Sequence, residues 1–464
     1  MERLGIVLML LITGLTVTGI SVYNGGKAGG IKDAGYHCTG CNIVMVSVDL
    51  TRPDHMSAYG YPKNTTPNIE RFSRNTTVFT NAYSQSPFTM ESLISSFTSL
   101  YPLQHRVNTL NAPKRGFSDD FMMFPEVLRK KGYATYGIYD PSDVRPEYGL
   151  GRGFITYRSQ EGFSNDTDMI SAYINRSGDR SFFIYDQVFT LHTPNFPPPE
   201  YLDNFTEADW KFRNRSMEYW NSLSDLESNN KRYRKWQSFY YGNIEDNKTL
   251  DRYLSKSYDG ELRYVDSKIG KVFTLLKRRK MLNDTIVVVT ANHATQLGEH
   301  RAYGEGGLRK AGLNVPLMIY LPHKEQSGDR IDNFVASIDI APTLLDIIGV
   351  HDPEYSRQAE GVSLLPLISG NRDKLSKDYI ISEKFNGQKT FIDKKTGLKL
   401  NTFRSGKIRG IHNVTADPEE KNGLTNRTYW RYMHDRFKNV YERITGRDPF
   451  DTVEVNTTFP YYVK

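Results

Sequence analysis

Cysteine is nearly absent from this chain, whose 464 residues include only Cys38 and Cys41, in the stretch CTGC. Two thiols do not complete a structural zinc site, which takes four ligands. The pair also precedes a predicted strand rather than opening a helix, which disfavours a thioredoxin-like redox role. For an exported chain, a short disulfide loop is the expected state. No cysteine lies near residues 86–102, which excludes a cysteine-based nucleophile in that segment.

Internal repeats and low-complexity blocks are also missing. Hydrophobic residues make up 38% of the chain and charged residues 24%, which is typical of a globular protein. The net charge of +7 suits solubility and favours anionic over cationic substrates. The basic run at 277–280 follows a helix predicted over 258–276 and favours its C-terminal end. We interpret that run as a helix cap and expect no nucleic-acid partner.

The N-terminus contains the one long apolar stretch that we single out, the uncharged residues 4–23, which have about the length that spans a bilayer. No clear small-x-small cleavage site follows it. Residues 1–24 are therefore either a signal peptide or an N-terminal membrane anchor, and residues 25–41 are a linker that contains the cysteine pair. Either alternative predicts an extracellular or cell-surface protein, secreted or membrane-anchored.

Glycosylation signals support export. Eleven asparagines begin an N-x-[ST] triplet, the acceptor for N-linked glycans. They are Asn64, Asn75, Asn165, Asn175, Asn204, Asn214, Asn247, Asn283, Asn413, Asn426 and Asn456.

Short apolar runs alternate with helical periods, which predicts an α/β protein with a mainly parallel sheet. The expected strands are 43–49, 134–140, 182–189, 286–293 and 315–322. Two of them end in polar residues: Asp49 closes the first, and Asn292 and His293 close the fourth. Because ligand sites form at the carboxyl ends of parallel strands, we expect these three side chains to converge.

The segment 86–102, SPFTMESLISSFTSLYP, predicts a helix that begins at Ser86-Pro87 with a capping hydroxyl. Thr89 in its first turn is either a capping residue or a nucleophile. Residues 200–250 are polar, basic and aromatic, and we interpret them as an inserted cap. Its tryptophans, Trp210, Trp220 and Trp236, either stack on a sugar ring or, as we favour, pack the insert onto the body.

Several blocks, in order, resemble the sulfatase family of the alkaline phosphatase superfamily. They are NIVMVSVDLTRPDHMSAYGYPKNTTPNIERF (42–72), VFTNAYSQSPFTMESLISSFTSLYP (78–102), LHTPNFPPPEY (191–201), TIVVVTANHATQLGEH (285–300) and NVTADPEEKNGL (413–424). The resemblance implies an alkaline phosphatase-like α/β/α sandwich over residues 42–365, with the cap at 200–250 inserted. It also implies a small C-terminal α+β subdomain over 366–464.

The resemblance places Thr89 at the position of the nucleophile. Most sulfatases have a Cys or Ser there, which becomes formylglycine, and threonine cannot, so no formylglycine is expected. Threonine is the nucleophile in superfamily members that move phosphoryl groups, such as lipoteichoic acid synthases. The chain also departs from the family at Leu50, where a second Asp is usual, and at Glu305, where relatives have a Lys or His.

The resemblance implies one divalent metal, Ca²⁺, Mn²⁺, Mg²⁺ or Zn²⁺, and assigns roles to this chain's residues. The metal ligands are Asp49, Thr89, Asn292 and His293; the catalytic residues are Thr89 and His192; the substrate-binding residues are Arg52, His192 and Lys310. Arg52, Asp54 and His55 match the family and have a structural alternative, in which they orient loops through hydrogen bonds.

The sequence thus predicts a metal-dependent hydrolase or transferase of sulfate or phosphate esters, acting on a glycan or a lipid. The alternative is a cell-surface glycoprotein that keeps the sulfatase fold, has lost catalysis and binds anionic glycans. In the first case we expect Asp49, Thr89, Asn292 and His293 to cluster and the carboxylate of Glu305 to be turned away.

Overall fold

The computed structural model describes residues 36–107, 120–139, 144–159, 166–203, 205–225, 232, 235, 236, 238, 247–324, 328–371 and 375–450. The described residues belong to one compact unit. The predicted leader and most of the predicted linker lie outside them. Among the residues described, no helix has the length and apolar character that a membrane crossing requires.

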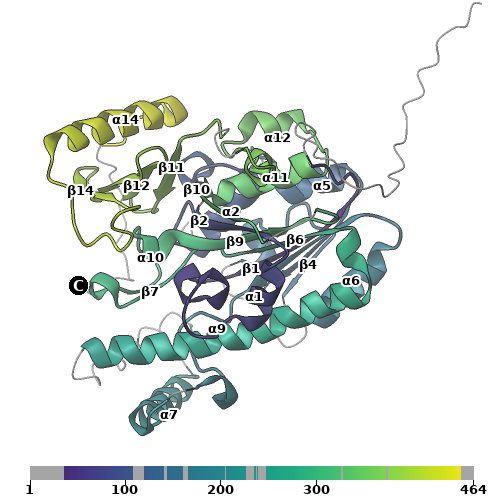
Figure 1. Ribbon diagram of the computed structural model, residues 1–464, viewed down its shortest axis with the longest axis horizontal. Helices are drawn as coiled ribbons and strands as arrows, with labels where there is room; N and C mark the ends of the chain where they lie inside the picture. Colours follow the sequence, from purple (N-terminus) through teal and green to yellow (C-terminus); the bar gives the residue numbers. More distant parts are fainter. Residues whose placement is uncertain are drawn as a thin grey trace, which may run out of the picture. The chain divides into compact units, whose positions relative to one another are not determined.

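A twisted sheet of eight strands forms the centre of the molecule (Figure 1). Its order is β10 (Arg330–Ala336), β2 (Thr77–Tyr83), β9 (Asn314–Tyr320), β6 (Thr285–Thr290), β1 (Asn42–Val48), β5 (Phe182–Val188), β3 (Ala134–Tyr139) and β4 (Thr156–Ser159). All neighbours are parallel except β9, which is antiparallel to both β2 and β6. The five predicted strands and the mainly parallel sheet are confirmed.

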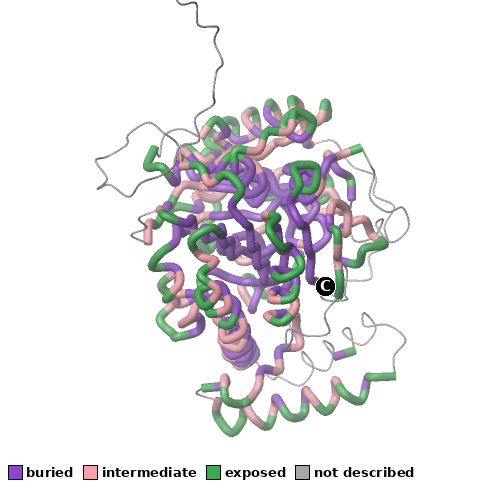
Figure 2. The backbone as a smooth tube through the Cα atoms, turned by 90° about the vertical axis from the view of Figure 1, so that its right-hand side faces the viewer, coloured by how far each residue is buried: buried purple, intermediate pink, exposed green. Residues whose placement is uncertain are grey.

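Helices cover both faces of this sheet because its strands are apolar on both sides. In β1, Ile43 and Met45 face one core, whereas Val44, Val46 and Val48 face the other. The first core is closed by α2 (Thr89–Thr98), α5 (Phe124–Lys130), α11 (Ile340–Ile347) and α13 (Leu365–Ile368). The second is closed by α1 (Pro67–Ser73), α6 (Asp166–Ser177) and α9 (Asn247–Arg278). Figure 2 shows the buried residues gathered between these layers.

A second, antiparallel sheet follows in the C-terminal part, in the order β11 (Tyr379–Glu383), β12 (Lys389–Asp393), β13 (Leu398–Thr402) and β14 (Ile408–Asn413). Helix α14 (Arg427–Thr445) packs on it through Met433 and Phe437. The α/β sandwich with a small C-terminal α+β part is thus as predicted. Leu367 and Ile368, beyond the predicted boundary at 366, pack in the main core.

The remaining elements are short or peripheral. Besides short 3-10 helices, the described residues form α3 (Pro102–His105), α7 (Glu207–Ser222), β7 (Gln296–Leu297), β8 (Tyr303–Gly304), α10 (Lys310–Leu313) and α12 (Pro353–Gln358). Helix α7 belongs to the predicted cap and lies beside α9 (Figure 1). Trp236 there is buried, donates to the Ser216 hydroxyl and contacts Trp220 edge to face, so these two rings pack the insert.

Two local predictions can be compared directly with the structure. Cys38 and Cys41 form the expected disulfide. The predicted helix start at Ser86 is wrong: α2 begins at Thr89, after Phe88 in extended conformation. The backbone N–H of Glu383 in β11 donates to the carbonyl of Gln85 at 2.8 Å, which holds the chain before α2 extended like a strand.

Candidate active site

The carboxyl ends of β1 and β6 bring the predicted polar residues together. The two strands are parallel neighbours, with Ser47 opposite Thr290. Asp49 and the pair Asn292 and His293 therefore leave the sheet side by side. All three side chains are buried. The convergence expected from the strand ends is present in the structure.

Thr89 completes this group from the other side, because it is the first residue of α2. No side chain caps that helix terminus. Its partial positive charge is therefore available to stabilise a negative charge on the Thr89 oxygen or on a ligand. Thr89 retains 6% exposure, whereas Asp49 and His293 have none, so Thr89 is the one of these three residues that solvent reaches.

The hydroxyl of Thr89 faces two acceptors. Its Oγ1 lies 3.1 Å from Nε2 of His293 and 3.3 Å from Oδ2 of Asp49. Nδ1 of His293 lies 3.0 Å from the carbonyl oxygen of Ala294, which only accepts, so Nδ1 holds the ring proton. Nε2 is then the unprotonated nitrogen, and its lone pair faces the Thr89 hydroxyl.

Burial sets the electrostatics of the group. It raises the pKa of Asp49 to about 6, against partial compensation by His192, Asn292, Thr89 and the Leu50 N–H. It also lowers the pKa of His293, with Glu305 opposing the shift. At neutral pH the site therefore holds an ionised Asp49 beside a neutral imidazole.

The donor atoms fit a cation. Oδ1 of Asp49 lies 3.4 Å from Nε2 of His293. Both atoms offer an electron pair, and the hydroxyl of Thr89 is the proton donor that lies within hydrogen-bond distance of both side chains. The buried amide of Asn292 lies beside Asp49 and lowers its pKa, and apart from that contact its polar atoms have no hydrogen-bond partner. In the described part of the chain, no group of three His, Cys, Asp or Glu side chains could hold a metal ion. A cation would therefore depend on the neutral oxygens of Thr89 and Asn292 as well.

Glu305 is directed toward this group, and the expectation that its carboxylate turns away is wrong. Its Oε2 lies 3.6 Å from Nε2 of His293, with the side chain 39% exposed. Gly304 and Gly306 on either side have φ values of 78° and 94°, which other residues adopt at a cost. The Gly306 N–H donates to the carbonyl of Pro87, which holds this turn against the segment before Thr89.

The three predicted substrate contacts lie at different places. His192 is close enough for its charge to act on both Asp49 and His293. Arg52 is buried and bonded to the carboxylates of Asp54 and Glu299. The charge of Lys310 acts on Asp54, which is on the outer side of Arg52.

Arg52 and its neighbours form a supporting network that sequence reasoning described only in part. The Arg52 N–H donates to the hydroxyl of Tyr258 in α9, and that hydroxyl donates to the carbonyl of Leu50. His55 bonds Asp259 of the same helix at 2.7 Å. These contacts tie the loop after β1 to α9, as the structural alternative for these residues anticipates. The participation of Glu299 had no signal in the sequence.

Comparisons with known proteins agree with this architecture. The sulfatase family model matches residues 41–350, and a model described as N-sulphoglucosamine sulphohydrolase, C-terminal, matches residues 298–445. The chain is 24% identical to an arylsulfatase of Clostridium perfringens, over 88% of this chain and 95% of the relative.

Two solved structures show the same fold. Phosphonate monoester hydrolase of Agrobacterium radiobacter superposes with a TM-score of 0.64 at 17% identity, covering 88% of this chain and 95% of that one. A protein in complex with its substrate D-glucosamine-2-N,6-O-disulfate superposes with a TM-score of 0.69 at 18% identity, covering 89% and 100%. The match over residues 41–350, more than half of the chain, shows that the chain belongs to the sulfatase family.

Proposed function

We propose that this protein is a metal-dependent hydrolase or transferase of sulfate or phosphate esters, with Thr89 as its nucleophile and no formylglycine. The observation that carries the proposal is the position of the Thr89 hydroxyl at the start of α2, 3.3 Å from Oδ2 of Asp49 and 3.1 Å from Nε2 of His293. A hydroxyl needs such a base because it is a weak nucleophile when protonated.

The chain's own residues account for the first step. Thr89 Oγ1 bonds to the sulfur or phosphorus of the ester while its proton passes to Oδ2 of Asp49, to which the hydroxyl donates at 3.3 Å; the lone pair of His293 Nε2 is left for the cation. The bond to the ester oxygen breaks, and the leaving alkoxide takes a proton from water on the side of His192, which contacts the leaving group. The start of α2 stabilises the charge on the transferred group. The ester formed on Thr89 is then removed by water, in hydrolysis, or by a second hydroxyl, in transfer.

A divalent cation would be held by Asp49, Thr89, Asn292 and His293. When bound, it would lower the proton affinity of the Thr89 hydroxyl and offset the charge of an anionic ester. The sulfatase family typically uses such a metal, and the imidazole ligand favours Zn²⁺ or Mn²⁺ over Ca²⁺. Arg52 and Lys310 remain proposed substrate contacts. Arg52 can bind substrate only when the substrate displaces the carboxylate of Asp54 or of Glu299.

The proposed substrate is a sulfated or phosphorylated glycan or lipid outside the cell. The disulfated glucosamine bound by one structural relative supports the glycan class. Exposure of Asn64, Asn75, Asn214 and Asn283 leaves these sequons accessible to glycosylation, which supports an exported, secreted or membrane-anchored protein.

A second candidate function is an inactive cell-surface glycoprotein that binds anionic glycans. The orientation of Glu305 favours it, because a carboxylate 3.6 Å from His293 repels an anionic ester at that point. Its prediction is binding without turnover.

The two candidates are separated by Thr89→Val, which removes the hydroxyl and keeps the shape. Thr98→Val, in the same helix and also buried, is the matched control. We expect one or more of an aryl sulfate, a phosphomonoester and a phosphodiester to be turned over by the wild type and by Thr98→Val. Thr89→Val should lose that activity by at least about a thousandfold. Turnover that survives in Thr89→Val refutes the role of Thr89. A wild type without bound metal and without turnover of any of the three supports the second candidate.

A further inference from the structure

A hollow of about 540 Å³ lies on the C-terminal sheet, between the turn that joins β11 to β12 and the turn that joins β13 to β14. Its lining residues are Lys384, Asn386, Gln388, Phe403, Arg404 and Ser405. None of them belongs to the group around Thr89. Their side chains combine cations, amides, a hydroxyl and an aromatic ring.

The β11–β12 turn, which supplies three of the lining residues, contacts the residue that precedes Thr89. Phe385, between two lining residues, packs against Phe88 with ring centroids 4.8 Å apart, and Phe88 directly precedes Thr89. The same segment is held on its other side by the Gly306 N–H, which donates to Pro87. A chain-like ligand that leaves Thr89 along Phe88 therefore meets the β11–β12 turn.

A bulge between β13 and β14 places an additional arginine, Arg409, near the hollow. The register between β13 and β14 pairs Asn401 with Gly410 and Thr402 with Ile408, which leaves Arg409 as the extra residue of a bulge. A bulge redirects the side chain of its extra residue. The charge of Arg409 acts on Lys384 and on Arg309, which come from other elements.

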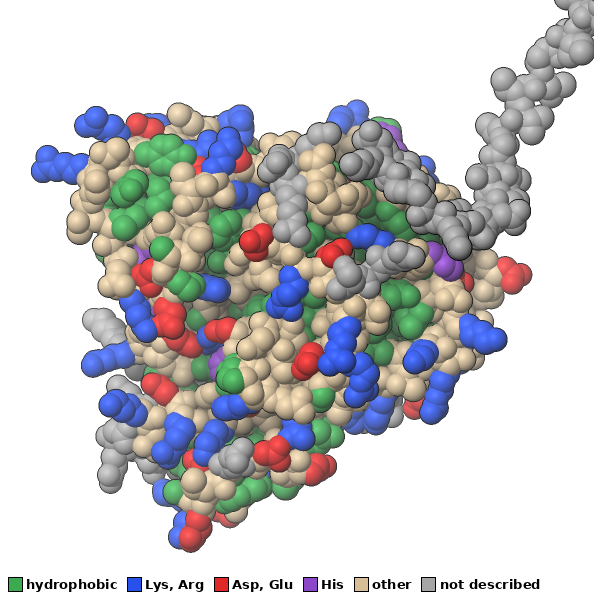
Figure 3. Space-filling model, in the orientation of Figure 1, with side chains coloured by type: hydrophobic (Ala, Val, Ile, Leu, Met, Phe, Trp, Pro, Cys, Tyr) green, Lys and Arg blue, Asp and Glu red, His purple; other side chains and the backbone are tan. Residues whose placement is uncertain are grey.

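Among the residues described, neither Arg309 nor Arg409 takes part in an ion pair, and the carboxylate acting on Arg309, that of Glu420, bonds buried Lys399 at 2.6 Å. Burial and the charge of Arg409 lower the pKa of Lys384 to about 8. An incoming anion would relieve this repulsion. On the face shown in Figure 3, basic and acidic side chains are interspersed.

Phe403 provides the apolar part of the surface. It is 48% exposed, and the guanidinium of Arg409 lies 5.8 Å from its ring centroid. An exposed ring offers a flat apolar surface to the face of a sugar, while neighbouring amides and cations bind hydroxyl and anionic groups. This combination fits an acidic sugar better than a purely apolar or purely anionic ligand.

We propose that this hollow is an accessory subsite for a second sugar that carries a sulfate or carboxylate group, so that the protein binds acidic oligosaccharides. Phe403 stacks on that sugar, Arg409 and Lys384 bind its anionic group, and Asn386 and Gln388 bind its hydroxyls. The reacting sugar is placed at Thr89, so this assignment rests on the proposed function.

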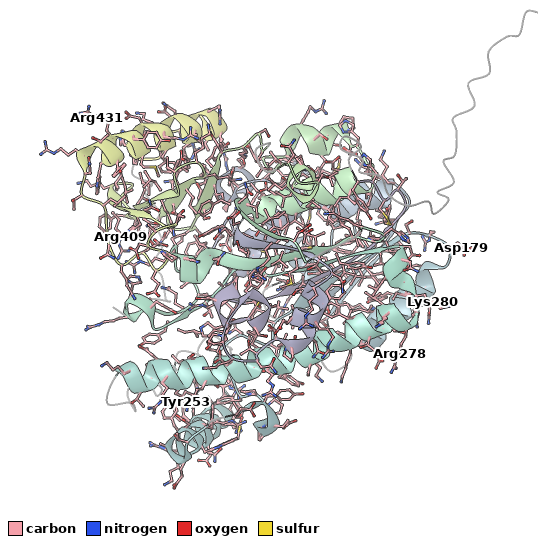
Figure 4. The ribbon with its side chains drawn as sticks, in the orientation of Figure 1. Asp179, Tyr253, Arg278, Lys280, Arg409 and Arg431 are labelled. Atoms are coloured by element: carbon pink, nitrogen blue, oxygen red, sulfur yellow. A yellow bond between two sulfur atoms is a disulfide. The ribbon has the colours of Figure 1, made fainter. Side chains whose placement is uncertain are left out.

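The test uses the full chain with Thr89→Val, which prevents turnover, and isothermal titration with two probes. One is D-glucosamine-2-N,6-O-disulfate and the other a sulfated heparin tetrasaccharide. Arg409→Ala and Phe403→Ser should weaken tetrasaccharide binding by about tenfold and leave the monosaccharide within about twofold. Phe403→Tyr should restore binding, since it keeps the ring. The matched control is Arg431→Ala, which removes an exposed arginine from α14 (Figure 4) and should change neither affinity.

Three results would overturn the subsite: a tetrasaccharide no tighter than the monosaccharide, an equal loss for both probes, or an equal loss in Arg431→Ala. The last would indicate attraction by net charge alone. Failure of the proposed function is a separate result, read from turnover in Thr89→Val. A protein that depends on Thr89 for turnover and not on Arg409 for binding keeps its proposed function and loses the subsite.

Discussion

Replacing Asp49 by Asn should make the metal-free protein more stable at neutral pH while abolishing activity. The carboxylate is buried, and burial raises its pKa from 3.8 to about 6. A raised carboxyl pKa means that the folded state binds the proton more tightly than the unfolded state. Stability therefore falls as pH rises from about 4 to about 6, and the full cost is present above that range. At 1.36 kcal/mol per unit, this cost is about 3 kcal/mol.

The amide removes the charge and keeps the main contact. Its oxygen can still accept from the N–H of Leu50, which lies 2.9 Å from Oδ1 of Asp49. Because the shape is unchanged, the gain should be up to about 3 kcal/mol at pH 7.5 and close to zero at pH 3.5, where the wild-type carboxyl is protonated in both states.

Urea denaturation in EDTA at the two pH values measures this difference. Asp332→Asn, which changes an exposed carboxylate in β10, is the control and should be neutral at both. Added Mn²⁺ or Zn²⁺ should stabilise the wild type and have little effect on Asp49→Asn, because the cation offsets the same charge. Our account of the site is refuted if Asp49→Asn is less stable than the wild type at pH 7.5 in EDTA, or gains equally at pH 3.5.

Three further predictions follow from groups around and beyond the site. Glu305→Gln should move the acid limb of kcat/KM to lower pH, because the carboxylate raises the pKa of His293 and activity requires the neutral imidazole; an unmoved limb would contradict this. Burial raises the pKa of Glu261 to about 8, so its folded state loses stability between about pH 4.5 and 8, and Glu261→Gln should raise Tm at pH 9 but not at pH 4. Replacing Cys38 and Cys41 by Ser should cost about 2 kcal/mol in urea denaturation, since the disulfide closes a short loop; no change in midpoint would refute that estimate.

The sheet was predictable from sequence to the extent that its strands are continuous apolar runs. Buried parallel strands such as β1 and β6 produce such runs because helices cover both faces. The apolar run of β9 predicted a strand equally well. Its antiparallel direction could not be predicted, because the direction of a strand depends on the connections before and after it. Strand β2 contains Thr80 and Asn81 at its less buried positions, and its pattern did not stand out.

The site was predictable where it depends on topology and not where it depends on loop conformation. Asp49 and His293 meet because parallel strands end at the same edge, a consequence of the fold alone. The orientation of Glu305 depends on the conformation of two glycines and on a hydrogen bond to Pro87, which is distant in sequence. Arg409 is directed by a bulge; the adjacent Gly410 is compatible with one, but the position of the bulge depends on the register with β13.

Position 50, where the sulfatase family usually has a second Asp, is buried in this protein and does not accommodate a carboxylate. Its side chain is 2% exposed among the apolar residues under α9, and its φ of 58° is one that leucine adopts at a cost. Leu50→Asp should therefore bury an unpaired charge and destabilise the protein by at least about 3 kcal/mol in urea denaturation, without increasing bound metal. Leu50→Met, which conserves volume, should cost less than about 1.5 kcal/mol. If Leu50→Asp instead folds with wild-type stability and binds more metal, the side chain faces the donors and not the core. In that variant the second carboxylate of the site would be the one at position 50. In the wild type the second carboxylate near the site is that of Glu305, 3.6 Å from Nε2 of His293.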